Sequence, residues 1–379
     1  LGIATTAIVS RTLGAGDELR AYRLGGLIIT VGGSLVFVIC MALWFLQSHI
    51  MTALGAEDSL LPLVRQYWVP WLMAAWTGAF LYFGYSVCRS HGDTKLPGYM
   101  MVATSLTNIA LDPLYIFVFG WGLPGAAWAT ITSFGIGCLV IYPKLLKRRW
   151  IRFDLRELAL WNALKQLNGI MAPAMVSQLM PAVSAMLATA LVAGFGSAAV
   201  AAWGLGTRLE FFSIVVVLAL TMSMPPMIGR MLGAGDIEQI RKLVRLAVRF
   251  VVVWQLAIGL TWVVASGLVS ELFSSDSDVQ EVLAGYLVRV PLSYSGLGVC
   301  MLMVSVCNAL GLAMRALLVS TLRLFLCFLP LLWIGSQING VYGLMSGALV
   351  GNLFAGAMAY SFYRAGMTRL KAELASGKA

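Results

Sequence analysis

The chain has 379 residues, of which 60% are apolar and only 11% are charged, with a mean hydropathy of +0.87. These values lie far from the soluble globular average, so they exclude a soluble domain and predict an all-α polytopic membrane protein. A net charge of +10 suggests a nucleic-acid partner only if the basic residues cluster on one surface. They gather instead in alternate loops, which argues against such a partner.

Apolar stretches of about 20 residues or more recur along the whole chain, long enough to cross ~30 Å of hydrocarbon as helices. After a partial span at 1–10, the predicted spans are 22–46, 62–88, 98–119, 124–146, 166–194, 198–229, 243–268, 281–308, 314–335 and 341–363. We therefore expect about ten complete spans and one partial span.

The distribution of charge predicts the orientation of these spans. Basic residues occupy alternate loops, including 11–23, 144–165 and 230–249, whereas the loops between them are acidic or short. This positive-inside pattern predicts a multi-pass protein of the cell membrane, the inner membrane in a bacterium, with both termini of the intact protein in the cytoplasm.

A repeat divides the chain into two homologous halves. The segment Arg11-Thr-Leu-Gly-Ala-Gly-Asp17 returns 219 residues later as Arg230-Met-Leu-Gly-Ala-Gly-Asp236, and the same shift carries Tyr67 onto Tyr286. Such a repeat predicts two parallel six-helix lobes, twelve spans in all. By this symmetry we interpret the chain as a fragment without its first helix and most of its second. The N-terminal lobe then covers 1–150 and the C-terminal lobe 151–379.

Two polar segments have both a structural and a functional interpretation. The Gly-Ala-Gly-Asp turns lack the preceding strand and the Lys-Ser/Thr of a phosphate-binding loop, so we interpret them as helix stops whose Asp17 and Asp236 cap the next helix. The segment 144–157 holds six basic residues and two aromatic ones. A cytoplasmic linker with Trp150 and Phe153 at the lipid headgroups explains it, and a specific anionic-lipid site is the alternative.

Asp112 is the clearest functional candidate, because an acid inside a span is costly enough to require a partner or a task. Asn108 precedes it by one helical turn, and Pro113 frees the carbonyl of the residue four positions before it. Tyr67 and Thr130 lie at a similar depth by helix-rise arithmetic. These four oxygen-bearing side chains predict a site for a proton or a small hard cation such as Na⁺. Interhelical hydrogen bonding is the structural alternative.

Three further ionisable residues fall within spans. Arg208 and Glu210 are two residues apart, so they project from different faces of their helix and are not expected to pair. Arg289 lies about two turns inside its span. We interpret all three as buried polar residues of a substrate pathway, with helix bridging or snorkelling as the alternative.

The ordered motifs resemble the multidrug and toxic compound extrusion (MATE) family across essentially the whole chain. They are the two Gly-Ala-Gly-Asp turns, Gly92-Asp-Thr-Lys-Leu-Pro97, Asn108-Ile-Ala-Leu-Asp-Pro113 and Gly122-Leu-Pro-Gly-Ala-Ala-Trp-Ala-Thr130. The resemblance implies two six-helix lobes around a central cavity. Its DinF-like branch implies an ion site in the N-terminal lobe at Asn108, Asp112 and Thr130, with Tyr67 in register. A NorM-like branch places acids in the seventh and tenth helices, but here the spans 166–194 and 281–308 contain no Asp or Glu apart from Glu281 at the outer edge.

This resemblance implies a secondary active antiporter that exports cationic or amphipathic drugs and toxic compounds by alternating access, in exchange for H⁺ or Na⁺. We expect no cofactor beyond that coupling ion, and no catalytic activity. The expected partners are small-molecule substrates and membrane lipids, with the protein a monomer.

Three other functions are weighed against it. A lipid-linked saccharide flippase of the same superfamily would show a more cationic cavity than Arg65, Arg208 and Arg289 supply. A major-facilitator transporter would carry an Asp-Arg-rich loop in place of Leu-Gly-Ala-Gly-Asp. A membrane enzyme is disfavoured because the two histidines, His49 and His91, lie in loops on opposite sides.

Overall fold

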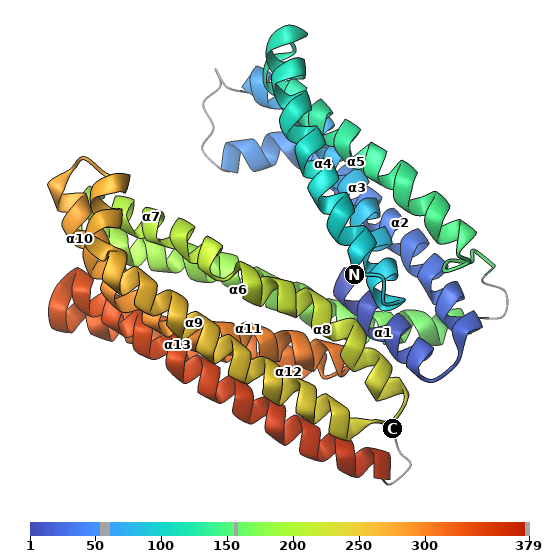
Figure 1. The fold of residues 1–379 in the computed structure, drawn as a ribbon. Coiled ribbons are helices and arrows are strands. Elements are labelled where there is room, and N and C mark those ends of the chain that lie inside the picture. Colours follow the sequence, from blue (N-terminus) through green and yellow to red (C-terminus); the bar gives the residue numbers. More distant parts are fainter. Residues whose placement is uncertain (54–60, 155–157, 376–379) are drawn as a thin grey trace. The chain divides into compact units, whose positions relative to one another are not determined.

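Every regular element in the computed structural model is helical over the residues that it describes, 1–53, 61–154 and 158–375 (Figure 1). Within this part of the chain, eight helical segments have the length and apolar composition of a membrane span. The all-α polytopic class predicted from composition is therefore confirmed. The chain forms two compact units, Leu1–Leu167 and Asn168–Ala379, whereas the predicted lobe boundary lies at residue 150.

The N-terminal unit is built around α3. This helix packs against α1, α2 and α5, and α4 packs against α5. Close approach depends on small residues, since a Cβ on Gly137 of α5 would lie within 3 Å of Leu81 on α3 and Thr104 on α4. The elements are α1 (Gly2–Gly14), α2 (Glu18–Ala53), α3 (Leu61–Ser90), α4 (Lys95–Pro113), the π-helical turn η1 (Leu114–Val118) and α5 (Gly122–Lys147).

The C-terminal unit is built around α11, which packs against α8, α9, α12 and α13. Helix α13 contains two residues with non-helical backbone angles, Asn339 and Gly340. The elements are α6 (Leu160–Ala193), which begins in the first unit, α7 (Ser197–Ser213), α8 (Val215–Gly233), α9 (Ile237–Phe273), α10 (Ser277–Arg289), the 3₁₀ turn η2 (Val290–Ser293), α11 (Tyr294–Ala309), α12 (Ala313–Leu322), the π-helical turn η3 (Arg323–Phe328) and α13 (Leu329–Ala375).

The two Gly-Ala-Gly-Asp segments are the helix stops that the sequence predicts. Gly16 and Gly235 have φ of 82° and 77°, a left-handed conformation that glycine adopts without steric cost. The Asp17 carboxylate accepts a hydrogen bond from the Arg20 backbone N–H at 3.1 Å, and the Asp236 carboxylate accepts one from that of Gln239 at 3.1 Å. Each aspartate therefore caps the helix that follows its turn.

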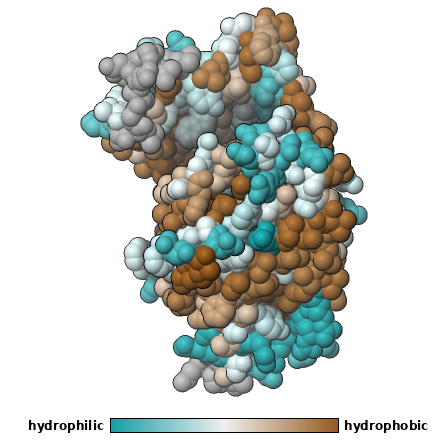
Figure 2. All heavy atoms as spheres, turned by 90° about the vertical axis from the view of Figure 1, so that its left-hand side faces the viewer, coloured by the Kyte–Doolittle hydropathy of each residue, from teal (hydrophilic) through white to brown (hydrophobic). Residues whose placement is uncertain are grey.

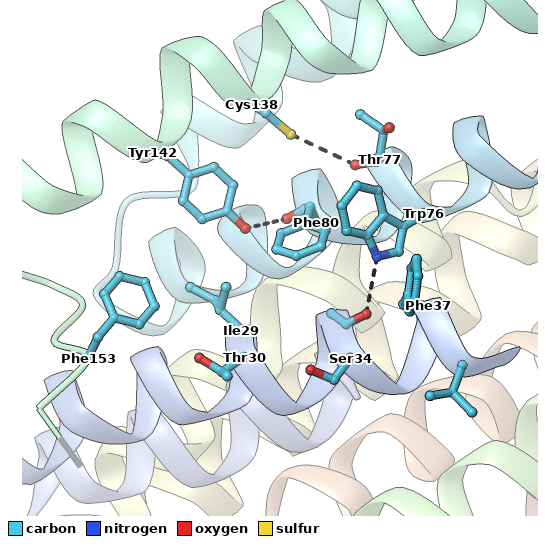
Figure 3. A pocket seen from close by; sticks show the side chains of 12 residues that line it. Ile29, Thr30, Ser34, Phe37, Trp76, Thr77, Phe80, Cys138, Tyr142 and Phe153 are labelled. Atoms are coloured by element: carbon cyan, nitrogen blue, oxygen red, sulfur yellow. Dashed lines mark hydrogen bonds between the residues drawn. The ribbon is translucent and has the colours of Figure 1, made fainter. Parts of the chain in front are cut away.

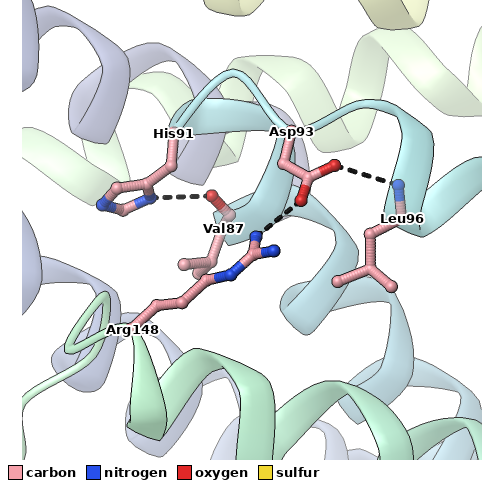
Figure 4. A network of polar contacts seen from close by, with 5 residues as sticks. All are labelled: Val87, His91, Asp93, Leu96 and Arg148. Atoms are coloured by element: carbon pink, nitrogen blue, oxygen red, sulfur yellow. Dashed lines mark hydrogen bonds and ion pairs between the residues drawn. The ribbon is translucent and has the colours of Figure 1, made fainter.

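A polar network fixes the turn between α3 and α4 (Figure 4). The Asp93 carboxylate accepts hydrogen bonds from the Leu96 backbone N–H at 3.0 Å and from the Arg148 guanidinium at 2.6 Å, which joins the turn to the end of α5. His91 stacks on Trp150, with ring centroids 4.6 Å apart. Trp150, which the sequence predicts to lie at the lipid headgroups, therefore packs against His91.

Large apolar side chains cover much of the outer surface, as Figure 2 shows for one face. Phe117 is 77% exposed and Val264 is 88% exposed. In water such a surface would be an association liability, but in a bilayer it contacts acyl chains. The six cysteines are all free thiols, and Cys88, Cys300, Cys307 and Cys327 are buried.

Glycine lets a buried aromatic ring rest against α7. A Cβ on Gly206 would lie 2.5 Å from the Cε1 atom of Tyr286, whose side chain is only 1% exposed. Trp203 meets the same ring edge-on at 5.4 Å. The position of the Tyr286 ring therefore depends on the absence of a side chain at residue 206.

We expect Gly206→Ala to destabilise the protein by about 1–3 kcal/mol, because the added methyl group overpacks against Tyr286. The matched control is Gly204→Ala in the same helix, where a Cβ would meet nothing within 4 Å. That change should be neutral or stabilising by up to ~1 kcal/mol through helix propensity. Thermal unfolding in detergent measures both, and equal apparent Tm values for the two variants would contradict this assignment.

The Asp93–Arg148 pair predicts a pH-dependent contribution to stability. Partial burial alone would raise the pKa of Asp93, but hydrogen bonds from Leu96 and Arg148 outweigh it and hold this pKa below its ordinary value of 3.8. The stabilisation is therefore present above that value and is lost as the pH falls through the lower, folded pKa. Asp93→Asn should cost at most about 0.5 kcal/mol at pH 7, since both partners are partly exposed.

The measurement is the unfolding temperature of wild type, Asp93→Asn, Arg148→Gln and the double variant across pH 3–7. The difference between wild type and Asp93→Asn should be constant near neutral pH and shrink toward pH 3. The two single effects should not add, because both changes remove one interaction. Additive effects that do not vary with pH would show that the pair contributes nothing.

Candidate functional site

Asn108 and Asp112 face one another along α4, one helical turn apart. The Asn108 amide Nδ2 lies 3.4 Å from the Asp112 Oδ1 atom and donates to it. Both side chains are partly buried. The distance is at the long end for a hydrogen bond, so the contact is weak. The structure thus brings together the two residues that the sequence pairs by spacing.

Thr130 joins this pair from the neighbouring helix α5. The same Asn108 amide donates to Thr130 Oγ1 at 3.3 Å, and the Thr130 hydroxyl donates its own proton to the Ala126 carbonyl at 3.0 Å. The threonine oxygen is therefore oriented as an acceptor toward α4. With the amide hydrogens used in this way, the Asn108 carbonyl oxygen keeps its capacity to accept a hydrogen bond or to ligate a cation.

The backbone next to the acid departs from α-helical geometry. Pro113 has no N–H and so leaves the Ile109 carbonyl without its intrahelical donor. The π-helical turn η1 follows directly and packs on α5, where a Cβ on Gly125 would lie 2.9 Å from the carbonyl carbon of Tyr115. A proline and a π-helical turn beside an intramembrane carboxylate are irregularities of the kind found at functional sites.

Tyr67 is not joined to this group. It lies on α3 and is partly buried, and it forms no hydrogen bond with any residue in the described part of the chain. Of the four predicted oxygen-bearing side chains, the structure links Asn108, Asp112 and Thr130 and leaves Tyr67 apart.

The C-terminal unit has no carboxylate at the corresponding positions, which are Cys327 and Leu331. Cys327 is fully buried and its sulfur lies 4.0 Å from that of Met358. Helix α13 approaches closely here, because a Cβ on Gly351 would lie 2.8 Å from the Cys327 carbonyl oxygen and one on Gly347 would overlap the Leu331 carbonyl. Backbone packing occupies the space that polar side chains occupy in the N-terminal unit.

Glu210 has a partner on another helix of its unit. Its Oε2 atom accepts a hydrogen bond from the Tyr286 hydroxyl at 3.4 Å, between α7 and α10. The charge of Arg323, the first residue of η3, also acts on this carboxylate. The hydroxyl of Tyr294 is buried without a hydrogen-bond partner in the described residues. A second intramembrane carboxyl group thus lies among tyrosine hydroxyls.

Arg208 and Arg289 are placed differently from one another. Arg208 is exposed and forms no ion pair with Glu210 among the described residues, as their spacing predicts. Arg289 donates to the Gly285 carbonyl at 3.0 Å and lies 5.1 Å from the ring centroid of Tyr342, whose hydroxyl donates to Glu281 at 2.9 Å. Arg289 is therefore part of a packed polar cluster between α10 and α13.

Sequence reasoning missed the role of Tyr286. Its ring is buried against α7 and its hydroxyl reaches Glu210, 76 residues earlier in the chain. One signal was present, because Tyr286 is the repeat partner of Tyr67. The repeat selected the right residue type, but only the helix packing shows which of the two tyrosines contacts an acid.

Comparisons with known proteins agree with this architecture. A family model described as MatE matches residues 1–114 and 173–334. The crystal structure of the Vibrio cholerae MATE transporter VcmN in the bent form is 50% identical, with a TM-score of 0.95 over 97% of this chain and 84% of that chain.

Two curated relatives extend the comparison. The FAD transporter of Shewanella oneidensis is 31% identical over 95% of this chain and 81% of its own length. The multidrug export protein MepA of Staphylococcus aureus is 23% identical over 92% of this chain and 77% of its own length. MATE proteins are transporters, which accords with the absence of a recognisable catalytic motif in the sequence. This chain, an integral multi-pass membrane protein, belongs to the MATE family of transporters.

Proposed function

We propose that the protein is a secondary active antiporter that exports cationic, amphipathic compounds in exchange for H⁺ or Na⁺. One observation carries the proposal: the Asp112 carboxylate lies within a span and is connected through Asn108 to Thr130 on the next helix. A carboxylate inside a membrane helix is costly, so its presence argues for an ion-binding task. The relatedness to a multidrug export protein supports the substrate class.

The geometry supports coupling through a local exchange of hydrogen bonds. Protonation of Asp112 removes the negative charge that the Asn108 amide faces at 3.4 Å. A Na⁺ ion would instead draw on the oxygens of Asp112, Asn108 and Thr130, a ligand type that hard cations prefer. Either event changes the link between α4 and α5 beside Pro113 and η1, where the helix is least constrained. We propose that this change favours the drug-releasing state.

We expect Asp112→Asn to reduce ion-driven efflux by at least about tenfold while the protein stays folded, because the amide preserves size and hydrogen bonding but cannot bind a proton. The assay is dye efflux from proteoliposomes of the full-length protein, with proton and sodium gradients imposed separately. Undiminished gradient-driven export by this variant would exclude Asp112 as the coupling residue.

Thr130→Val tests the interhelical ligand in the same assay. It removes one hydroxyl, so the concentration of the driving ion for half-maximal rate should rise by about 2–10-fold. The matched control is Thr107→Val, because the Thr107 hydroxyl donates only to the Ala103 carbonyl of its own helix, at 2.8 Å. An equal response of the two variants would argue that Thr130 serves helix packing alone.

Glu210 is assigned to the substrate pathway in this proposal. Glu210→Gln keeps an oxygen that accepts from Tyr286 but removes the carboxylate charge, so the fold should persist. We expect a change in the half-saturating concentration of cationic substrates with little change for neutral ones, measured as initial efflux rates. Identical kinetics for both substrate classes would assign Glu210 to helix bridging.

A second candidate cargo is a flavin dinucleotide, which the similarity to the Shewanella oneidensis FAD transporter favours. FAD is anionic, so its export would call for basic side chains such as the exposed Arg208 rather than for carboxylates. Proteoliposomes loaded with FAD or with a cationic dye, and energised by the same gradients, distinguish the two. Export of FAD alone would replace the cationic substrate class.

A further inference from the structure

An apolar groove lies within the N-terminal unit, with α3 at its floor and α2 and α5 at its sides (Figure 3). Its volume is about 730 Å³, within the range of ligand-binding pockets. Phe37 and Trp76 line one end, Phe80 and Tyr142 the middle, and Phe153 of the linker the other end. The groove is separate from the Asn108–Asp112–Thr130 group.

The groove and α1 occupy different faces of α3. Gly2 of α1 packs directly against Tyr82 and Ser86. At 100° per residue, Tyr82 and Ser86 project about 120° from the direction of Trp76 and Phe80. Helix α1 therefore does not cover the groove, and Phe37 and Val38 on its edge are 52% and 61% exposed.

Most polar side chains of the groove already have partners within the unit. The Trp76 indole N–H donates to the Gly33 carbonyl at 3.1 Å, and the Tyr142 hydroxyl donates to the Phe80 carbonyl at 2.9 Å. The Thr30 and Thr77 hydroxyls donate to carbonyls of their own helices. None of the described residues that line the groove is acidic. It thus offers a hydrocarbon surface without the counter-charge that a cationic drug requires.

The length of the groove matches one bilayer leaflet. Its α2 lining extends from Ile29 to Val38, about 14 Å at 1.5 Å per residue. Half of a ~30 Å hydrocarbon core is about 15 Å. In the span predicted at 22–46, this lining runs from about 10 Å to about 24 Å from the end that the charge pattern predicts to be cytoplasmic, so the groove reaches the middle of the bilayer.

The linker that reaches one end of the groove carries basic residues. The Arg152 backbone N–H donates to the Tyr22 carbonyl at 3.0 Å, which attaches the linker to α2, and the next residue, Phe153, lines the groove. Arg149 and Arg152 are exposed. Asp154 adds one negative charge but is engaged in an interaction of its own. An apolar groove that ends at a linker with two exposed arginines is complementary to an acyl chain beneath an anionic headgroup.

We propose that this groove binds one anionic phospholipid of the cytoplasmic leaflet, with an acyl chain along α3 between α2 and α5 and its phosphate at Arg149 and Arg152. The bound lipid fills a surface that the described helices leave open and attaches the linker to α2. This inference concerns a structural lipid and is independent of the coupling ion and of the exported substrate.

Native mass spectrometry of the full-length protein tests the proposal. The purified protein is delipidated, incubated with phosphatidylglycerol or phosphatidylcholine of identical acyl chains, and released from detergent. We expect one retained phosphatidylglycerol, bound at least tenfold more tightly than phosphatidylcholine. Arg149→Gln and Arg152→Gln should each weaken retention about fivefold. The control Lys147→Gln, on the side of α5 opposite Cys138, should not.

A filling variant tests the acyl-chain part separately. Ser34→Trp places an indole in the groove and should reduce retention of phosphatidylglycerol at least tenfold, whereas Ile39→Trp, about 140° around α2 and 42% exposed, should leave it unchanged. Monodisperse elution and unchanged unfolding temperature verify that both variants fold. Equal retention by Ser34→Trp and wild type, equal loss in both tryptophan variants, or no preference for the anionic headgroup would each overturn the proposal.

Discussion

Hydrocarbon supplies no hydrogen-bond partner, so every polar group within a span must be satisfied by the chain itself. The structure meets this requirement locally wherever it can. Most serine and threonine hydroxyls in the spans donate to a carbonyl of their own helix, as Thr104 and Ser133 do. A carboxylate has no proton to donate and needs a donor from outside its own backbone. Asp112 and Glu210 therefore both lie beside a side chain that can donate a hydrogen bond.

Asp112 and Glu210 obtain their hydrogen-bond donors in different ways. Asp112 finds its donor, Asn108, on the same helix, and only the shared contact with Thr130 extends to a neighbour. Glu210 depends on Tyr286, a residue from a different part of its unit, whose ring position is fixed by Gly206 and Trp203. The first arrangement is local and loosely bonded, which suits an ion that must arrive and leave. The second is embedded in packing, which suits a fixed element of a substrate path.

Local patterns were therefore the part of the site that could be predicted. The four-residue spacing of Asn108 and Asp112 places them together on any helix, and depth arithmetic brought Thr130 to the same level. Tyr67 has no hydrogen bond to this group among the described residues, and depth arithmetic fixes only the height of a residue, not the direction in which its side chain projects. The contact between Glu210 and Tyr286 depends on how two distant helices pack, which no local pattern encodes.

Helix irregularities also divide into those that the local sequence predicts and those that depend on packing between distant helices. The predicted span 198–229 is interrupted at Ile214, and α9 satisfies the break: Gln255 donates to the Ser213 carbonyl at 3.1 Å and Trp262 to the Ser213 hydroxyl at 2.8 Å. The span predicted at 281–308 contains the 3₁₀ turn η2 around Pro291. The proline was visible in the sequence, whereas the Ser213 break is specified by donors that lie about 40–50 residues away along the chain.

The two repeats differ in helix packing at the positions of the proposed ion site. In both units a glycine packs closely against the backbone of a neighbouring segment: Gly125 against Tyr115 and Gly343 against Gly335. Further along α13, Gly347 and Gly351 continue this backbone contact at Leu331 and Cys327. The corresponding residues of α5 are Ala129 and Ser133, which carry side chains where the C-terminal unit has glycine. A carboxylate placed at Leu331 would therefore need wider helix spacing before it had room for a ligand shell.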